Sequence, residues 1–189
     1  MRTKVCKVCR QQFEPFKPMQ SVCSPECALS LAKSKRAKEE KVQRVKERKQ
    51  DRVRKEELKS PRDWLNDCQL IANRYARIRD RNDGCISCDR QASWGGQWHG
   101  SHFRSVGAAS AVRLNLWNIH KACSICNHHL SGNVAGYLPR LIHKIGAEKV
   151  AWLQGQNQVT RYSVDYLKRY KLVIGKRLRR MEKRYAMQG

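Results

Sequence analysis

Residues 120–129 read HKACSICNHH and bring two cysteines, three histidines and an asparagine into ten positions, in a chain that has six histidines in all. Thiolates, imidazoles and amide oxygens are metal ligands, and imidazole also transfers protons near neutral pH. Three interpretations are open from this stretch alone. Cys123 and Cys126 hold a metal, the histidines and Asn127 hold a different metal or perform chemistry, or the cluster is a zinc-stabilised turn.

Eight of the nine cysteines occur in close pairs, which indicates metal ligation. The basic N-terminus is not followed by the apolar segment of a secretory signal, so we expect a cytoplasmic protein whose thiols stay reduced. The pairs form two sets of four: Cys6, Cys9, Cys23 and Cys27, then Cys85, Cys88, Cys123 and Cys126. Each set suits one tetrahedral Zn²⁺ with no open position. We therefore predict two structural zinc ions, and any catalytic metal needs other ligands.

The charge of the chain predicts a polyanionic partner. Lys and Arg total 40 against 16 Asp and Glu, a formal net charge of +24. No apolar run has the length of a membrane helix, so we expect no membrane partner. Nucleic acid is the leading candidate. Ribosomal and other structural RNA-binding proteins share this charge, so composition alone does not indicate an enzyme.

The N-terminal part predicts a zinc knuckle in residues 1–29 that leads into a helix. Ser24 and Pro25 suit the N-cap and the first helical position, which puts Cys27 on the first helical turn. Residues 30–60 contain no Gly or Pro and many charge pairs at helical spacing. Their apolar residues are too few for a coiled coil, so we interpret this segment as an exposed helical linker with weak DNA contact.

A second helix should begin at Ser60 with a capping box to Asp63 and end near the turn Asn82-Asp83-Gly84. Apolar residues recur along it at intervals of three or four, which predicts a face that packs on the following segment. Cys68, the cysteine outside the pairs, lies on this face and is expected to be buried and inert.

After it, residues 98–103 suit a strand in which Ser101 and His99 share a face and His102 faces the other side. Residues 137–189 predict short helices and a basic final helix from Ser163. The fold class is small α+β, with a zinc-stapled core in residues 61–136. The nucleic-acid contacts expected are Arg104, Lys168, Arg169, Lys176, Arg177 and Arg180, although a plain amphipathic helix explains the last five equally.

Residues 85–133 resemble the HNH (ββα-metal, His-Me finger) nuclease motif: a histidine at a strand end, a loop, an asparagine, and C-x2-C-N nine residues later. The whole chain resembles the NinG (Rap) recombination nucleases of lambda-like bacteriophages, including the N-terminal knuckle, the charged helix, GSHF and CSICNHHLSGN. The resemblance implies Mg²⁺- or Mn²⁺-dependent cleavage of branched DNA, such as Holliday junctions and D-loops, with phage or host recombination proteins as possible partners.

The resemblance also implies roles for three residues. His102 matches the general base that deprotonates the attacking water. Asn118 matches the asparagine that ties down the loop and orients that histidine. Asn127 matches the helix position that contributes an oxygen to the catalytic metal.

One departure from the family pattern concerns the second metal ligand. Many HNH nucleases have Asp or His directly before the general base, and this chain has Ser101 there. Either Asn127, phosphate oxygens and waters hold the metal, or His99, His128 or His129 completes its shell. Imidazole ligands favour Mn²⁺, Zn²⁺ or Ni²⁺ over Mg²⁺, so use of His128 would change the metal preference.

Two other readings compete with a junction-specific nuclease. The chain is a non-catalytic, zinc-dependent nucleic-acid-binding protein, or it is a less selective HNH nuclease. In both, His120 is expected to be a surface or helix-capping residue and His143 a packing or solvated one. A symmetric DNA junction would favour a homodimer, but no residue pattern identifies a dimer face.

Overall fold

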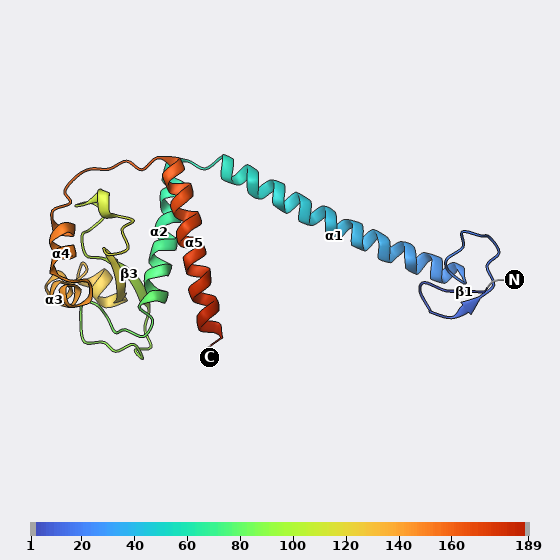
Figure 1. Cartoon of the computed structure of the whole chain (residues 1–189), viewed down its shortest axis with the longest axis horizontal. Helices are drawn as coiled ribbons and strands as arrows, with labels where there is room; N and C mark the ends of the chain where they lie inside the picture. Colours follow the sequence, from blue (N-terminus) through green and yellow to red (C-terminus); the bar gives the residue numbers. More distant parts are fainter. Residues whose placement is uncertain (1–2, 188–189) are drawn as a thin grey trace. The chain divides into compact units, whose positions relative to one another are not determined.

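The computed structural model of the chain describes residues 3–187. It comprises two compact units, of which the first ends at Leu58 and the second begins at Lys59 (Figure 1). The fold is small α+β, as expected from the sequence. Among the residues described, no helix is both long and apolar enough to cross a membrane.

The first unit begins with a knuckle that leads into a long helix. Strands β1 (Lys4–Val5) and β2 (Gln12–Phe13) form a small antiparallel pair. Helix α1 (Pro25–Glu57) follows with Ser24 as its N-cap, whose side chain accepts a hydrogen bond from the backbone N–H of Cys27 at 3.3 Å. The predicted cap and the place of Cys27 on the first turn are confirmed.

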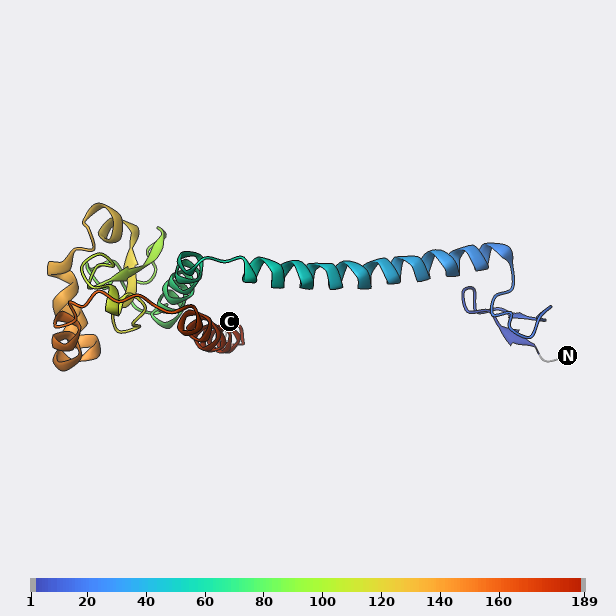
Figure 2. The ribbon, with the colours of Figure 1, turned by 90° about the horizontal axis from the view of Figure 1, so that it is seen from above.

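Helix α1 buries none of its residues. Figure 2 shows it as one uninterrupted ribbon. Glu26 in its first turn and the cations Arg54 and Lys55 in its last turn complement the helix dipole. The predicted exposed helix is confirmed. Its stability comes from helix-forming residues, capping and charge placement, because it packs no apolar face.

The second unit begins with helix α2 (Pro61–Arg79), which has the predicted capping box between Ser60 and Asp63. Its buried face packs against the last helix, α5 (Val164–Ala186), which begins after Ser163 as predicted. Cys68 is fully buried there and its Sγ contacts the Leu167 carbonyl at 3.2 Å. Burial raises the pKa of the Cys68 thiol to about 11. The prediction of a buried, unreactive thiol is confirmed.

A hairpin lies at the centre of the second unit. Strands β3 (Trp98–His102) and β4 (Ile119–Cys123) pair antiparallel, with His99 opposite Ala122 and His102 opposite Ile119. Because side chains alternate along a strand, these two pairs lie on opposite faces of the hairpin. Ile119 packs against α2, whereas Ala122 belongs to the main core. The predicted faces of His99 and His102 are confirmed.

Helices α3 (Val134–Ile145) and α4 (Ala147–Gln154) complete that main core. Tyr137 and Leu141 of α3 and Leu153 of α4 are fully buried. The Tyr137 hydroxyl donates a hydrogen bond to the Ser101 carbonyl at 3.0 Å, which fixes α3 to β3. A single 3-10 turn, η1 (Ser110–Val112), lies in the loop between the strands.

The segment after β4 is the least regular part of the core. The sequence predicts a helix from Ser124, and the structure has a five-residue π-helix there, η2 (Ile125–His129), closed by a bond from the Leu130 N–H to the Ile125 carbonyl at 3.2 Å. Single π-turns are rare and occur often at functional sites. This turn carries Asn127 and His128.

Gly100 allows β3 to approach α2 closely. A Cβ at this position would lie 2.8 Å from the Cα of Asn73 and 2.9 Å from its Cβ, so the two backbones would have to separate. We expect Gly100→Ala to lower the free energy of unfolding by about 1–3 kcal/mol, measured by urea denaturation. Gly107→Ala is the control, since a Cβ at Gly107 meets no atom within 4 Å. Equal stability of the two variants would contradict the close approach.

Candidate functional site

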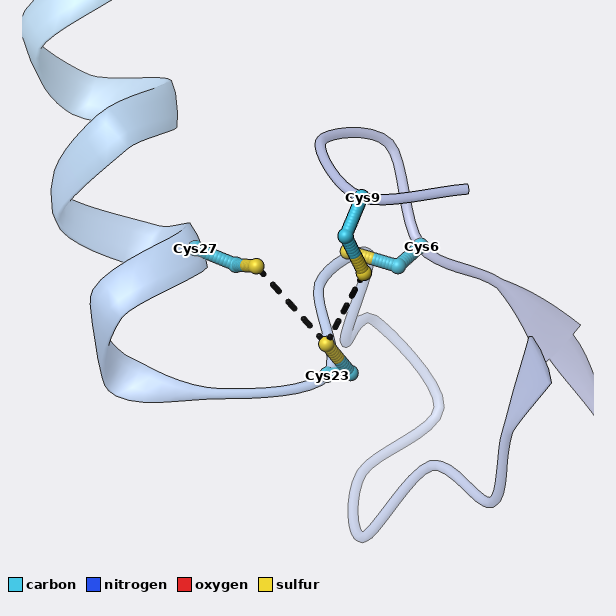
Figure 3. A group of neighbouring side chains, drawn as sticks. All are labelled: Cys6, Cys9, Cys23 and Cys27. Carbon is cyan, nitrogen blue, oxygen red and sulfur yellow. Dashed lines mark hydrogen bonds between the residues drawn. The ribbon is translucent and has the colours of Figure 1, made fainter. Parts of the chain in front are cut away.

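The first cysteine cluster joins the knuckle to α1 (Figure 3). The sulfur atoms of Cys6, Cys9, Cys23 and Cys27 all lie within 4.8 Å of one another. Cys23 Sγ is 3.4 Å from Cys9 Sγ and 3.7 Å from Cys27 Sγ. Zn–S bonds of about 2.3 Å place tetrahedral sulfurs roughly 3.8 Å apart. The cluster can therefore hold zinc with little adjustment.

The second cluster joins three segments of the other unit: the loop before β3, the end of β4 and the π-turn η2. It comprises Cys85, Cys88, Cys123 and Cys126, whose sulfurs also lie within 4.8 Å of one another. Backbone N–H groups point at its sulfurs, with Ser87 N and Cys123 N at 3.4 and 3.2 Å from Cys85 Sγ. Such donors stabilise thiolates. This cluster can hold zinc as well, and it is the more deeply buried of the two.

Arg90 is part of the second cluster's surroundings, a role that the sequence analysis missed. Its Nη1 lies 3.2 Å from Cys88 Sγ and 3.8 Å from Cys123 Sγ. Four thiolates around Zn²⁺ carry a net charge of −2, and the guanidinium offsets part of it. The available signal was an arginine two residues after a C-x2-C pair.

A pocket lies beside this cluster. It is lined by Asn73, Arg77, Gln97, Trp98, His99, Gly100, Asn127 and His128. Asn127 Nδ2 is 3.3 Å from His99 Nδ1, and the rings of His99 and His128 are nearly perpendicular with centroids 4.7 Å apart. Burial lowers the pKa of His99, and the neighbouring His128 and Arg77 lower it further. These effects favour the neutral ring at pH 7, and its Nδ1 lone pair then accepts from the Asn127 amide.

His102 does not line this pocket. It lies on the other face of the hairpin, where its Nε2 is 3.0 Å from the Arg113 carbonyl and 3.2 Å from Gln69 Nε2. Burial lowers its pKa. The sequence from Ser124 could form a helix in which Asn127 or His128 faces the same cleft as His102, but the structure places Asn127 and His128, and not His102, in this pocket. The reason is strand alternation, which turns His99 toward Asn127 and His102 toward α2.

Asn118 is fully buried and ties together both ends of the loop that follows β3. Its Oδ1 accepts from Arg104 N at 2.7 Å, and its Nδ2 donates to the carbonyls of Arg104 and Val112 at 3.0 and 3.1 Å. The Asn118 carbonyl also accepts from Phe103 N, the residue next to His102, at 2.9 Å. This geometry agrees with the loop-anchoring role that the family resemblance implies.

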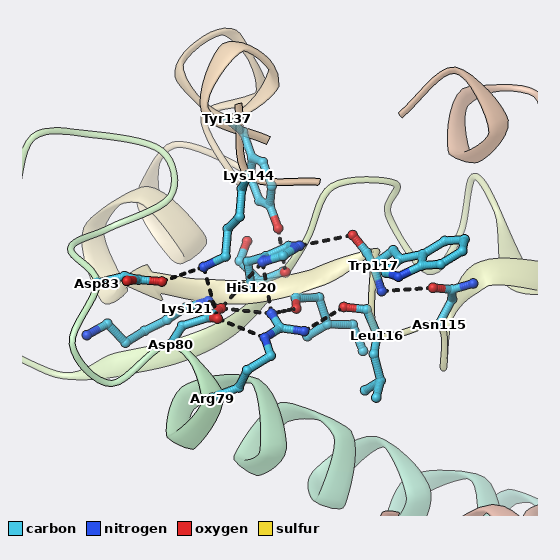
Figure 4. A network of polar contacts seen from close by, with 12 residues as sticks. Arg79, Asp80, Asp83, Asn115, Leu116, Trp117, His120, Lys121, Tyr137 and Lys144 are labelled. Carbon is cyan, nitrogen blue, oxygen red and sulfur yellow. Dashed lines mark hydrogen bonds and ion pairs between the residues drawn. The ribbon is translucent and has the colours of Figure 1, made fainter. Parts of the chain in front are cut away.

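His120 is buried, so the expected surface or capping position is wrong. It lies in a polar network with Arg79 and Asp80 (Figure 4), because β4 covers the end of α2 at this point. His120 Nδ1 is 2.8 Å from Arg79 Nη2, and its Nε2 is 3.0 Å from the Trp117 carbonyl. Burial lowers the pKa of His120, which favours the neutral ring.

Asp80 is the negative centre of this network, and the sequence analysis did not identify it. Burial alone would raise its pKa, but the two hydrogen bonds and the charge of Arg79 outweigh burial and hold the pKa far below its usual range. Lys144 Nζ also lies 2.9 Å from Asp80 Oδ1. The network ends α2 at Arg79, before the predicted turn at residues 82–84, since the Asp80 side chain is drawn inward to β4.

Arg79 fixes the segment on both sides of Asn118. It donates to the Leu116 carbonyl at 2.9 Å and to the Ile119 carbonyl at 2.8 Å. The loop anchored by Asn118 is thus held from two directions. No motif marks this arginine in the sequence.

The residues expected to contact nucleic acid fall into two groups. Lys168, Arg169, Lys176, Arg177 and Arg180 are exposed on α5. Arg104 instead contacts Asn157 Oδ1 through Nη2 at 2.5 Å and is only partly exposed. His129 and His143 are exposed and line no part of the pocket that contains His99.

The Asp80 network generates a stability prediction. Asp80→Asn leaves Arg79 and Lys144 without their buried counter-charge, and we expect a loss of about 3–5 kcal/mol in the free energy of unfolding. Asp83→Asn removes an exposed partner of the same lysine and should cost less than about 1 kcal/mol. Chemical denaturation of both variants measures the difference. Similar losses in the two would show that the network contributes no more than a surface ion pair.

The metal content of cysteine variants tests the two clusters independently. We expect two zinc ions per chain in the wild type and one in either Cys85→Ser or Cys23→Ser, measured by elemental analysis. Calorimetry should show that Cys85→Ser lowers the unfolding midpoint of the second unit by on the order of 10 °C or more, because a structural zinc contributes directly to folding. Cys23→Ser should leave that transition in place. Two zinc ions retained in either variant would contradict the ligand assignment.

Comparison with known proteins identifies the family. The family model described as "Bacteriophage Lambda NinG protein" matches residues 1–184. Protein ninG of Escherichia phage lambda is 36% identical over 182 residues, covering 90% of this chain and 88% of the relative. Protein ninG of Enterobacteria phage H19B is 35% identical over 185 residues (92% and 91%), and that of Salmonella phage P22 is 35% identical over 182 residues (90% and 89%). No solved structure matches the chain. The chain therefore belongs to the NinG family of phage lambda.

Proposed function

We propose that the protein is a metal-dependent DNA endonuclease that hydrolyses phosphodiester bonds in branched DNA during phage recombination. One observation carries the proposal. The pocket beside the second cysteine cluster joins His99, Asn127 and His128, which are metal-binding or proton-accepting side chains, to the cation Arg77. A neutral ligand set next to a fixed positive charge suits a site that receives a phosphodiester.

Asn127 and His128 are the candidate ligands for a divalent cation. Such a cation, when bound, supplies positive charge that offsets the charge developing on the phosphorane and the leaving oxygen. Asn127 directly follows Cys126, so the cysteine cluster sets the position of its amide. An amide and an imidazole together favour Mn²⁺ over Mg²⁺.

His99 takes the general-base role in this proposal. Across the pocket from Asn127, His99 has its Nδ1 at 3.3 Å from the Asn127 amide nitrogen. His102, the base by family resemblance, has its Nε2 against the Arg113 carbonyl and lies outside the pocket. We assign His102 to positioning: its ring holds the Arg113 end of the loop that Asn118 anchors.

Binding of DNA is attributed to the exposed face of α5. Eight of its cations are exposed (Lys168, Arg169, Lys176, Arg177, Arg179, Arg180, Lys183 and Arg184). Phosphate contacts from such a face supply affinity without reading sequence. Selection of branched over linear DNA would then depend on the shape of the DNA.

A cleavage assay tests the proposal. Full-length, zinc-loaded protein is incubated with a labelled four-way junction or linear duplex, with Mg²⁺, with Mn²⁺ or without either ion. We expect cleavage of the junction with Mn²⁺ or Mg²⁺ and none without them. His99→Ala and Asn127→Ala should reduce the rate by at least about 100-fold and, without added Mg²⁺ or Mn²⁺, bind the junction like the wild type. His129→Ala, outside the pocket, is the matched control and should cleave normally.

His102→Gln distinguishes the two candidate bases, because glutamine keeps a hydrogen-bond donor for the Arg113 carbonyl but cannot take a proton. We expect this variant to retain most of the activity. Loss of cleavage in His102→Gln together with activity in His99→Ala would return the base to His102. Absence of divalent-dependent cleavage in the wild type would favour the non-catalytic, zinc-dependent nucleic-acid-binding protein. Equal cutting of junction and linear duplex would favour the less selective nuclease.

A further inference from the structure

Helix α1 carries a strip of cations along one side. Lys41, Arg44, Arg48, Arg52 and Lys55 follow one another at intervals of three or four residues. At about 100° per residue, all five project within about 80° of the helix circumference. We call these five residues the α1 strip. All of them are exposed.

Acidic residues lie outside the strip. Between Lys41 and Lys55 the helix has two, Glu47 and Asp51. At the helical repeat Glu47 projects well away from the strip, and Asp51 adjoins its edge. Arg44 lies 3.8 Å from Glu40, and both side chains are more than 60% exposed. An exposed pair of this kind is worth less than about 1 kcal/mol, so Arg44 can exchange it for a stronger anion.

The composition of α1 disfavours an apolar partner. Val42, Val45 and Val53 are exposed and are interrupted by Lys46 and Lys49 at the same side of the helix. Neither a coiled-coil seam nor a membrane-binding face tolerates that interruption. No residue of the helix is buried. A polyanion is therefore the binding partner that the charge of the α1 strip favours.

The dimensions of the strip match a nucleic-acid backbone. Its cations rise by about 4.5–6 Å from one to the next and span about 21 Å in all. Phosphates of one duplex strand rise about 3.4 Å along the axis and also wind around it, so a straight strip meets the few phosphates on its own side of the duplex. Lysine and arginine side chains are long enough to adjust to this spacing.

We propose that the α1 strip is a second DNA-binding surface, which lies along the phosphates of a duplex arm. The choice of DNA over RNA rests on the proposed function, whereas the strip itself does not depend on it. Each cation that neutralises a phosphate releases condensed counterions. The segment interpreted from its sequence as a linker with weak DNA contact is in this view a main binding element.

Two variants with equal charge test the proposal. The strip variant carries Lys41→Gln, Arg44→Gln, Arg48→Gln, Arg52→Gln and Lys55→Gln. The control variant replaces five cations elsewhere on α1 (Lys35→Gln, Arg36→Gln, Lys46→Gln, Lys49→Gln and Arg54→Gln). Both lose five charges from the same helix, and glutamine has nearly the helix propensity of lysine and arginine. Circular dichroism and zinc content should be the same for both.

The readout is the affinity for a four-way junction at several salt concentrations, with zinc-loaded protein and without added Mg²⁺ or Mn²⁺. The slope of log K against log salt is negative, and each lost phosphate contact reduces its magnitude by about 0.9. In the strip variant we expect the magnitude of the slope to fall by about 3–4 and the affinity at 0.1 M salt to fall at least tenfold. In the control variant the magnitude of the slope should fall by less than about 1. Equal changes in both variants, or no change in either, would overturn the proposal.

An RNA arm of the experiment separates the two nucleic acids. A duplex RNA of the same sequence should bind the wild type more weakly than DNA and should discriminate less between the variants. Selective loss of RNA binding in the strip variant, with DNA binding intact, would overturn the assignment to DNA. Because binding is measured without Mg²⁺ or Mn²⁺, it does not depend on cleavage, and failure of the nuclease proposal leaves this result interpretable.

Discussion

The structure of the second unit depends on four sulfur atoms that meet at one point. Cys85 and Cys88 precede β3, Cys123 ends β4, and Cys126 lies in the π-turn η2. These four sulfurs lie within 4.8 Å of one another and could hold one Zn²⁺, which would offset the mutual repulsion of four thiolates. The backbone N–H groups and Arg90 that face the sulfurs would offset part of the same negative charge. A zinc ion bound there would stabilise the second unit by joining these three segments.

The geometry of the pocket that contains His99 depends on the second cysteine cluster. Trp98 is paired with Cys123 across the hairpin, so the neighbour of Trp98, His99, is held one position from a cysteine ligand. Asn127 follows the next ligand, Cys126. His99 and Asn127 therefore face each other over a distance that the cluster determines, although 28 residues separate them in sequence. In the proposed nuclease, this fixed geometry would allow the pocket to stabilise a transition state electrostatically.

Much of the fold was predictable because its signals are local. The N-caps at Ser24, Ser60 and Ser163 and the spacing of the cysteines each depend on a few neighbouring residues. The pairing of His99 with Asn127 was not, because it depends on strand register and on a π-turn that no propensity indicates. The burial of His120 on β4 also escaped prediction, since it depends on Arg79 and Asp80 at the end of α2, about 40 residues earlier in the chain. Local sequence signals predict individual helices and strands, whereas contacts between these elements determine which residues surround each histidine.

The distribution of charge bears on how a phosphate-binding protein can select branched DNA. Phosphate contacts carry no sequence information, so they cannot by themselves distinguish one duplex from another. The proposed α1 strip and the cationic face of α5 belong to different units. Two such surfaces in one chain can bind at the same time only to DNA that presents phosphates to both. Once one surface is bound, the other binds more tightly because the DNA is held at a high effective concentration. A junction offers several duplex arms around one point, so its preference over linear duplex would arise from avidity, with the pocket of His99 acting on whichever strand those contacts bring to it.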